Sequence, residues 1–159
     1  MNSINKKLVF LGLLTAIIVI ITSVHLVAKS QDNQWLEDHY YHQHVTELLQ
    51  NESHEEAFQY LTMLENHHSQ SPVIKRQLAV ALANLGQYKE ASAKMSEALE
   101  INPYLVEDPI FMLEFGRLSV LANNLLNAVV ILERCKGLEA PEGYPDYQEQ
   151  VTQLLEQLS

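Results

Sequence analysis

From Gln34 onward, apolar residues recur every three or four positions, which is the spacing of amphipathic helices, and no run alternates as a half-buried strand would. Short polar stretches rich in Asn, Ser, Gly and Pro break this pattern at regular intervals. They fall at residues 51–53, 69–72, 84–87, 102–109 and 122–124. The breaks divide the chain into helices of roughly 12–15 residues that follow one another in pairs. We therefore predict an all-α protein.

Several of the predicted helices begin with residues that suit a helix N-terminus. Ser53 followed by Glu56 has the spacing of a capping box, in which the two side chains bond each other's backbone N–H groups. Ser71–Pro72 and Asp108–Pro109 each place a capping side chain before a proline at the first helical position. We expect helices to start at all three places.

The apolar segment near the N-terminus has a different pattern. Leu8–Ala28 is 21 residues without Asp, Glu, Lys or Arg, and roughly 20 apolar residues suffice to cross a bilayer as a helix. Lys6 and Lys7 precede it and Lys29 follows, so the positive-inside tendency keeps the N-terminus in the cytoplasm. We predict a cytoplasmic tail and single-pass transmembrane anchor over residues 1–29 and a linker over 30–37.

A cleaved signal peptide is the alternative for this segment. Its apolar core would span about 7–15 residues and end in small residues. The run here is longer, and Ala28 alone offers a poor cleavage site. Length therefore favours an anchor that stays attached.

The helix pairs repeat with a fixed period. Aligning Ala57 with Ala91 gives an offset of 34 residues. The second unit, 72–105, has apolar and small residues on two helices, a glycine at the turn between them and a proline at the end. These residues are Leu78, Ala79, Leu82, Gly86, Tyr88, Ala91, Met95, Ala98 and Pro103. This pattern resembles the tetratricopeptide repeat (TPR) family. The small residues let two antiparallel helices approach, the larger ones fill the space between them, and Gly86 permits the turn.

The outer units match less completely. Unit 38–71 keeps Ala57, Leu61 and Leu64 but has Glu52 in place of the turn glycine and Ser69 in place of the closing proline. Unit 109–142 follows a three-residue insertion at Val106–Asp108, and its core positions are Phe115, Gly116, Ser119, Ala128, Leu132 and Cys135. The resemblance therefore implies an α-solenoid of three TPR-like helix pairs over 38–142.

The last segment, 143–159, carries a single apolar stripe. Its members are Tyr147, Val151, Leu154, Leu155 and Leu158, and polar side chains cover the remaining faces. A helix of this kind at the end of a repeat array is typical of a solubilising cap. We predict a C-terminal capping helix.

Charge limits the partners of the chain. All 20 acidic residues follow the apolar segment, against 8 basic ones, which gives this part a net charge of −12. Nucleic acids and anionic lipid surfaces both require basic patches, so neither is expected as a ligand. The acidity also keeps a helical domain soluble, which is the simpler reason for it.

Candidate chemistry is sparse. His39, His42 and His44 are close in sequence, but a zinc site needs three or four ligands, and no HExxH or CxxC pattern occurs, so we expect surface histidines and no metal. Cys135 occupies a small-residue position of the repeat, and we expect it to be buried and inert. Glycine-rich phosphate loops and catalytic triads are absent from the sequence. We expect no cofactor and no enzymatic activity.

The resemblance also implies a binding groove. In TPR arrays the first helix of each pair lines the concave side, where extended peptides or partner helices dock. The groove positions carried over from the family are His39, His42, Thr46, Leu49, Arg76, Gln77, Val80, Asn84, Leu113, Arg117 and Val120. Arg76 and Arg117 could bind a carboxylate of a partner, unless they are ordinary solvated surface residues.

These features favour a non-enzymatic scaffold on the outer side of a bacterial inner membrane, binding a segment of another envelope protein. The layout is similar to anchored TPR proteins of c-type cytochrome maturation and of the secretion channel, and the likeness does not choose between them. One alternative is a self-associating structural protein, in which the groove takes a neighbour's segment. A metal-binding accessory protein is the other.

Overall fold

The computed structural model describes residue 41 and residues 43–158, and these are helices and connecting turns without a β-strand. Residues 43–50 are helical. The elements that follow are α2 (His54–His67), α3 (Pro72–Asn84), α4 (Tyr88–Ile101), the 3₁₀ helix η1 (Pro103–Glu107), α5 (Pro109–Leu121), α6 (Leu125–Lys136) and α7 (Tyr147–Glu156). Glu47–Ser159 forms one compact unit, and the described residues before it belong to a second unit.

The predicted anchor, Leu8–Ala28, and the predicted linker lie outside the described residues. Within the described residues, no helix is both long enough and apolar enough to cross a membrane. The anchor therefore stays a prediction from the sequence.

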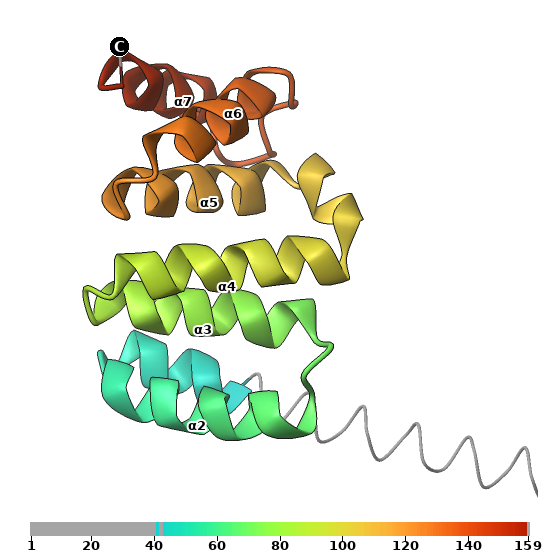
Figure 1. The fold of residues 1–159 in the computed structure, drawn as a ribbon, viewed down its shortest axis with the longest axis vertical. Helices are drawn as coiled ribbons and strands as arrows, with labels where there is room; N and C mark the ends of the chain where they lie inside the picture. Colours follow the sequence, from blue (N-terminus) through green and yellow to red (C-terminus); the bar gives the residue numbers. More distant parts are fainter. Residues whose placement is uncertain (1–40, 42, 159) are drawn as a thin grey trace, which may run out of the picture. The chain divides into compact units, whose positions relative to one another are not determined.

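Successive helices of the unit 47–159 pack in chain order, each on the next. Contacts join α2 to α3, α3 to α4, α4 to α5, α5 to α6 and α6 to α7, and Figure 1 shows these helices stacked one above another. Such nearest-neighbour packing is the hallmark of a repeat array. The all-helical repeat architecture predicted from the period is thus present in the described residues.

The turn inside each helix pair has the same conformation. Glu52, Gly86 and Asn123 all have positive φ, at 58°, 74° and 58°. In each turn the N–H of the following residue bonds a carbonyl five residues earlier: Ser53 to Leu48, Gln87 to Leu82 and Asn124 to Ser119, each at 2.9 Å. This is the Schellman arrangement that ends helices at a left-handed residue. Glu52 therefore adopts the backbone conformation of the turn glycine that it replaces.

The capping expectations hold at two of the three places. The Ser71 hydroxyl accepts from the Ile74 N–H at 3.4 Å, and an Asp108 carboxylate oxygen accepts from Ile110 and Phe111 at 2.9 and 3.0 Å. The prediction of a capping box at Ser53 is wrong, because the Ser53 side chain accepts no hydrogen bond from the first turn of α2. Its ψ is 55°, since it follows the left-handed Glu52, whereas side-chain caps need extended backbone such as the 110° of Ser71.

The three-residue insertion between the second and third units is accommodated locally. Asn102 ends α4, and its side chain accepts from the Tyr104 N–H at 3.2 Å. The chain then turns through η1 and reaches the Asp108 cap. A 3₁₀ turn uses short i→i+3 bonds and suits such a connector. The repeat therefore resumes with an offset of 37 instead of 34.

The core follows the predicted small and apolar positions. Ala79, Ala91 and Ala98 are fully buried, as are Ala128 and Cys135. A continuous cluster runs from α3 to α7 and includes Met95, Phe111, Leu132 and Tyr147. Because these side chains come from every helix between α3 and α7, the stack is held by one shared core.

The final helix caps the array as expected. Tyr147 and Val151 are fully buried, and Leu154, Leu155 and Leu158 pack against the same core. The Tyr147 hydroxyl donates to the backbone carbonyl of Cys135 on α6 at 3.3 Å. This bond satisfies the one polar atom that burial of a tyrosine brings inside.

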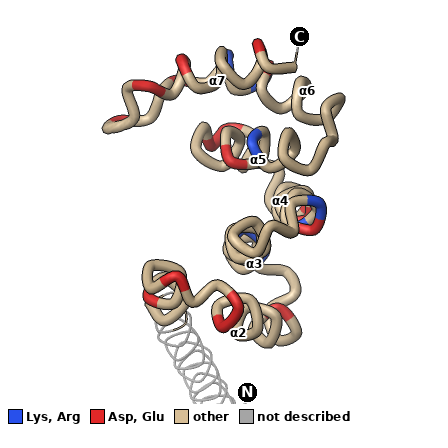
Figure 2. The backbone as a smooth tube through the Cα atoms, turned by 90° about the vertical axis from the view of Figure 1, so that its left-hand side faces the viewer, with Lys and Arg blue, Asp and Glu red and all other residues tan. Residues whose placement is uncertain are grey.

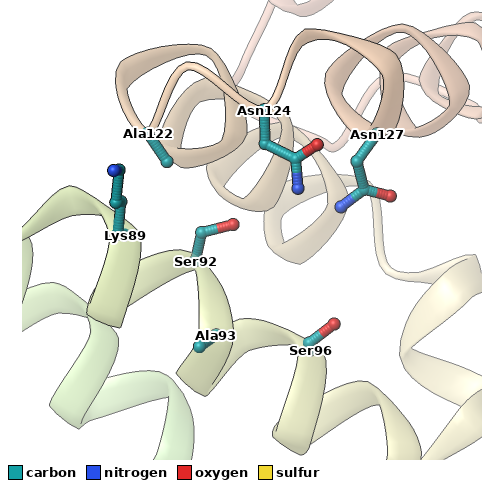
Figure 3. A pocket seen from close by; sticks show the side chains of 7 residues that line it. All are labelled: Lys89, Ser92, Ala93, Ser96, Ala122, Asn124 and Asn127. Atoms are coloured by element: carbon teal, nitrogen blue, oxygen red, sulfur yellow. The ribbon is translucent and has the colours of Figure 1, made fainter.

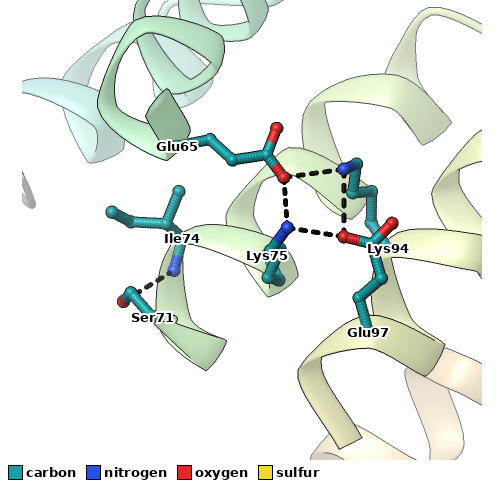
Figure 4. A network of polar contacts seen from close by, with 6 residues as sticks. All are labelled: Glu65, Ser71, Ile74, Lys75, Lys94 and Glu97. Carbon is teal, nitrogen blue, oxygen red and sulfur yellow. Dashed lines mark hydrogen bonds and ion pairs between the residues drawn. The ribbon is translucent and has the colours of Figure 1, made fainter. Parts of the chain in front are cut away.

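Charged side chains link the first three labelled helices. Lys75 on α3 contacts Glu65 on α2 and Glu97 on α4, each at 2.5 Å. Lys94 on α4 contacts the same two carboxylates at 2.6 and 3.1 Å, so the four groups form a ring (Figure 4). Burial alone would raise the pKa of Glu65, but the hydrogen bonds from both lysines outweigh it and lower that pKa. The same balance lowers the pKa of Glu97 and raises that of Lys75.

Candidate protein-binding groove

A cleft of about 330 Å³ lies between α3 and α5. The residues that line it are Val80, Ala83 and Asn84 from α3, Met95 from α4, and Glu114, Arg117, Leu118 and Leu121 from α5. Met95 and Leu118 are buried, whereas Leu121 is 55 % exposed at the rim. Most of this lining is aliphatic, and only a few polar groups interrupt it. Such a surface suits an apolar side chain of a partner flanked by polar groups.

Arg117 supplies a positive charge in the cleft. Its Nη2 donates to the Tyr144 hydroxyl at 3.3 Å, and that hydroxyl donates to Gln150 Oε1 at 2.8 Å. Among the described residues, no salt bridge joins Arg117 to a carboxylate. Its guanidinium is thus held in place by a neutral partner and keeps its charge for an incoming carboxylate.

Arg76, which was expected to bind a carboxylate of a partner, contacts carboxylates of its own chain. Its Nε donates to Glu114 Oε2 at 2.9 Å, its Nη1 lies 4.0 Å from Asp108 Oδ2, and its guanidinium carbon lies 5.9 Å from the centre of the Phe111 ring. Two carboxylates of this chain already neutralise it, and a ring covers one face. Arg76 therefore ties α3 to α5, and it is not a free cation in a groove.

The remaining groove predictions divide among several environments. Val80 and Asn84 line the cleft, whereas Leu113 is only 2 % exposed and belongs to the core. Val120 is half-buried against the same core, and Gln77 is half-buried. The groove face of α5 carries Glu114, Arg117, Leu118 and Leu121. Leu113 lies one turn before Arg117, at the edge of that face next to the core.

The predictions for the first unit are harder to place. His39 and His42 lie outside the described residues. Thr46 is exposed and Leu49 is half-buried. These two positions stay predictions.

Sequence reasoning missed five residues of the cleft: Ala83, Met95, Glu114, Leu118 and Leu121. Leu121 carried a signal, because a leucine at the last position of a helix, directly before the polar turn 122–124, has few residues of its own helix beside it. The other four residues line the cleft because of the way α3, α4 and α5 pack against one another. That packing cannot be inferred from the repeat period alone.

The sequence also raised a metal site and a reactive thiol as candidates, and the structure bears on both within the described residues. These residues hold no group of three or more His, Cys, Asp and Glu side chains that could bind a metal. Cys135 is fully buried, as predicted, and burial raises the pKa of its thiol. A thiol with a raised pKa is mostly protonated near neutral pH and a poor nucleophile.

The surroundings of the cleft are acidic. Residues 47–159 carry 17 acidic and 7 basic side chains. Figure 2 shows acidic residues spread along the tube, with basic ones in only a few short segments. Arg117 is therefore an exception in its own region, and a partner's carboxylate would find few other cations here.

Comparison with known proteins bears on the fold. No protein-family profile matches the chain, and no curated protein does at a significant level. Among solved structures, the chain is similar to the type III secretion translocator chaperone SycD of Yersinia enterocolitica. The TM-score is 0.63 at 17 % sequence identity, over 74 % of this chain and 80 % of that one. A likeness at this identity establishes architecture, and residues 47–158 accordingly have a TPR-like helical-repeat fold.

Proposed function

We propose that this chain is a membrane-anchored TPR-like adaptor that binds a segment of another protein in the cleft between α3 and α5. The observation that carries the proposal is the cleft itself, which has an aliphatic floor and a rim that includes the unneutralised Arg117. A complementary segment would place an aliphatic side chain on Met95 and Leu118 and an Asp or Glu beside Arg117.

The partner is a protein segment and not a small metabolite. The cleft is open on its outer side, because Leu121 and Asn84 at its rim are exposed. Its volume of about 330 Å³ is at the lower end for a small-molecule site, and such sites enclose most of their ligand. An open cleft along the first helices of a repeat array suits an extended peptide or a helix that continues beyond it.

The solved relative is compatible with this role. SycD is described as a chaperone of type III secretion translocators, which is a protein-binding task. With the apolar segment Leu8–Ala28 as an anchor, the same kind of array would present its cleft next to the outer face of a bacterial inner membrane. Assembly of an envelope complex is the role that we propose there.

Site-specific photo-cross-linking tests the cleft. A photoreactive amino acid replaces Asn84 or Leu121 in the full chain, and a matched control replaces Glu90, which is exposed on α4. We expect both cleft positions to capture the same partner in living cells and Glu90 to capture none. Arg117→Glu in the same chains should abolish the capture and lower the melting temperature by only a few degrees, since Arg117 loses one hydrogen bond, to Tyr144, and makes no salt bridge among the described residues.

Two results would count against the adaptor. Equal capture from Glu90 and from the cleft would indicate non-specific proximity. Undiminished capture after Arg117→Glu would remove the carboxylate from the recognition. The anchor is tested separately, because a chain anchored by Leu8–Ala28 stays with membranes after alkaline extraction and a cleaved chain is released.

A further inference from the structure

The outer face of α6 is strongly apolar and uncovered in the unit 47–159. Leu126 is 86 % exposed, Val130 69 %, Leu125 45 % and Val129 37 %. These four residues are called the α6 patch below. Helix α7 packs on a different side of α6, against the buried core. At these exposures the patch amounts to roughly 450 Å², which is within the range of the largest functional patches on soluble proteins.

The equivalent positions on α4 and α2 show whether the fold requires apolar residues on that face. With the offsets of 34 and 37, Leu126 corresponds to Lys89 on α4 and Glu55 on α2, and Val130 corresponds to Ala93 and Gln59. The fold thus accepts charged, polar and small side chains at both positions. Apolarity of the α6 patch is therefore not a requirement of the helix pair.

The equivalent face of α4 shows what normally lies there. Lys89, Ser92, Ala93 and Ser96 of α4 look across a pocket of about 340 Å³ at Asn124 and Asn127 from the start of α6 (Figure 3). On α4, then, this face looks toward the second helix of the next pair. On α6 no such helix follows within the described residues, since α7 is the only helix after it. Within the described residues, the α6 patch is thus the last face in the row of second helices.

Charge decides which occupant fits this face. No charged residue lies between Arg117 and Glu133, although residues 47–159 carry a formal charge of −10. Two copies of an acidic domain repel one another over most of their surfaces, and an uncharged face is where they can meet without that cost. A partner attracted by charge would find its complement elsewhere on this domain.

We propose that the α6 patch pairs with the α6 patch of a second copy of this chain, with the two helices antiparallel about a two-fold axis midway between Leu126 and Val130. Such a pairing is isologous and closes as a dimer. It sets Leu126 of each copy against the partner's Val130. It also sets Glu133 near the N-terminal end of the partner's α6, where the helix dipole favours a negative charge.

The area predicts the strength of this dimer. Two patches of roughly 450 Å² bury at most about 900 Å² in total, which is just below the usual range of a stable specific interface and in the range of weak ones. The dimer is thus weak and concentration-dependent. It leaves the cleft between α3 and α5 free, because none of the patch residues lines that cleft.

Cysteine cross-linking in cells tests the geometry. Two differently tagged full chains are co-expressed, one with Leu126→Cys and one with Val130→Cys, and mild oxidation should give a covalent dimer that carries both tags. The matched control uses Glu55→Cys with Gln59→Cys, the same repeat positions on α2, and should give no dimer. The native Cys135 is fully buried and stays in every variant.

A second measurement removes the patch without disturbing the helix. Leu126→Lys with Val130→Ala gives α6 the two residues that α4 carries at these positions, so the melting temperature should stay within a few degrees of the parent. In sedimentation of the full chain over a range of concentrations, this variant should dimerise at least about tenfold more weakly, which corresponds to 1.4 kcal/mol.

Several outcomes would overturn the proposal. A covalent ladder beyond the dimer would indicate head-to-tail stacking of the arrays. Cross-links to a protein of another size without a dimer would indicate a different partner on the patch. A dimer that is unchanged when Leu126→Lys and Val130→Ala are combined would place self-association on another surface.

Discussion

The two interfaces between successive repeats occupy equivalent positions and are filled by different chemistry. The first interface has the charged ring of Glu65, Lys75, Lys94 and Glu97. Adding the repeat offsets gives the second interface, which consists of Leu99, Met112, Ile131 and Arg134. Met112 and Ile131 belong to the core, Leu99 packs against it, and Arg134 is exposed and donates to the Val106 carbonyl at 3.4 Å.

This difference shows that the helical stack needs a filled space and not a particular chemistry. At the first interface, each charge is compensated by two opposite ones, so the lysines can be enclosed. At the second, burial of aliphatic side chains does the same task without desolvating a charge. A buried ion pair often contributes little more than a hydrophobic replacement of the same volume. The second interface should therefore be the more robust of the two.

The largest expected effect comes from moving a charge into the apolar interface. Met112→Lys places an ammonium at a position that is 3 % exposed, where the corresponding neighbours are Leu99 and Ile131. An uncompensated buried charge costs about 3–5 kcal/mol. Urea unfolding followed by circular dichroism should show this loss in the free energy of unfolding. A loss below about 1 kcal/mol would mean that the second interface opens easily to water.

The opposite exchange should cost less. Lys75→Met leaves Glu65 and Glu97 with Lys94 alone, and losing hydrogen bonds to charged groups should cost about 1.5–3 kcal/mol. Copying the whole second interface, with Glu65→Leu, Lys75→Met, Lys94→Ile and Glu97→Arg, removes the enclosed charges together. That quadruple variant should match or exceed the parent in unfolding free energy. If it were less stable than Lys75→Met, the ring would be a stronger element than we infer.

The pH dependence of the Lys75→Met effect follows from the direction of each shift. The folded pKa values of Glu65 and Glu97 are lowered from 4.5, so their contribution is present above pH 4.5 and is lost as pH falls through the lowered values. The pKa of Lys75 is raised from 10.5, so its contribution is present below pH 10.5 and is lost as pH rises through the raised value. The difference in unfolding free energy between the parent and Lys75→Met should therefore be largest near neutral pH and shrink at acidic and alkaline pH.

A smaller effect is expected inside the third helix pair. A Cβ on Gly116 would lie 2.6 Å from Leu132 Cδ2, and the equivalent pair in the preceding repeat is Ala79 with Met95. Gly116→Ala should lose about 1–2 kcal/mol through overpacking. Adding Leu132→Met copies the preceding repeat, and the flexible methionine should recover at least half of the loss in a double-mutant cycle. Additive losses would show that the two repeats pack with different helix spacings.

The smallest effects concern the turns. Gly86→Ala has open space around the new Cβ, so it tests backbone strain alone and should cost about 1 kcal/mol at the positive φ of 74°. Glu52→Gly relieves the same strain at a φ of 58° and should gain about 0.5–1 kcal/mol. Thermal melting should shift in opposite directions for the two variants. Equal signs would contradict the shared turn conformation.

Much of the fold could be read from residue spacing because its causes are local. Proline after Ser71 and Asp108 sets extended backbone before a helix, and these caps form as predicted. Small residues such as Ala79 and Ala91 are buried because a helix pair repeats its own contacts every 34 residues. The capping box at Ser53 failed because the turn before it already sets the backbone of that residue.

The candidate site was less accessible to sequence reasoning. Of the groove positions carried over from the family, Val80, Asn84 and Arg117 line the cleft, whereas Leu113 does not. Arg76 has the right position but meets Glu114 and Asp108, which come from 32 to 38 residues further along the chain. Whether an arginine is free depends on such distant neighbours, and a repeat pattern does not encode them.

The sequence by itself determined the helical repeat, its period and the residues that face the core, since each depends on contacts within one pair of helices. Only the tertiary structure decided which cation is free, where the cleft lies and which helix face stays uncovered. The free cation and the cleft arise where helices of neighbouring repeats meet, and the uncovered face depends on which helix packs beside α6. At such contacts the partner of a side chain is decided by packing rather than by spacing.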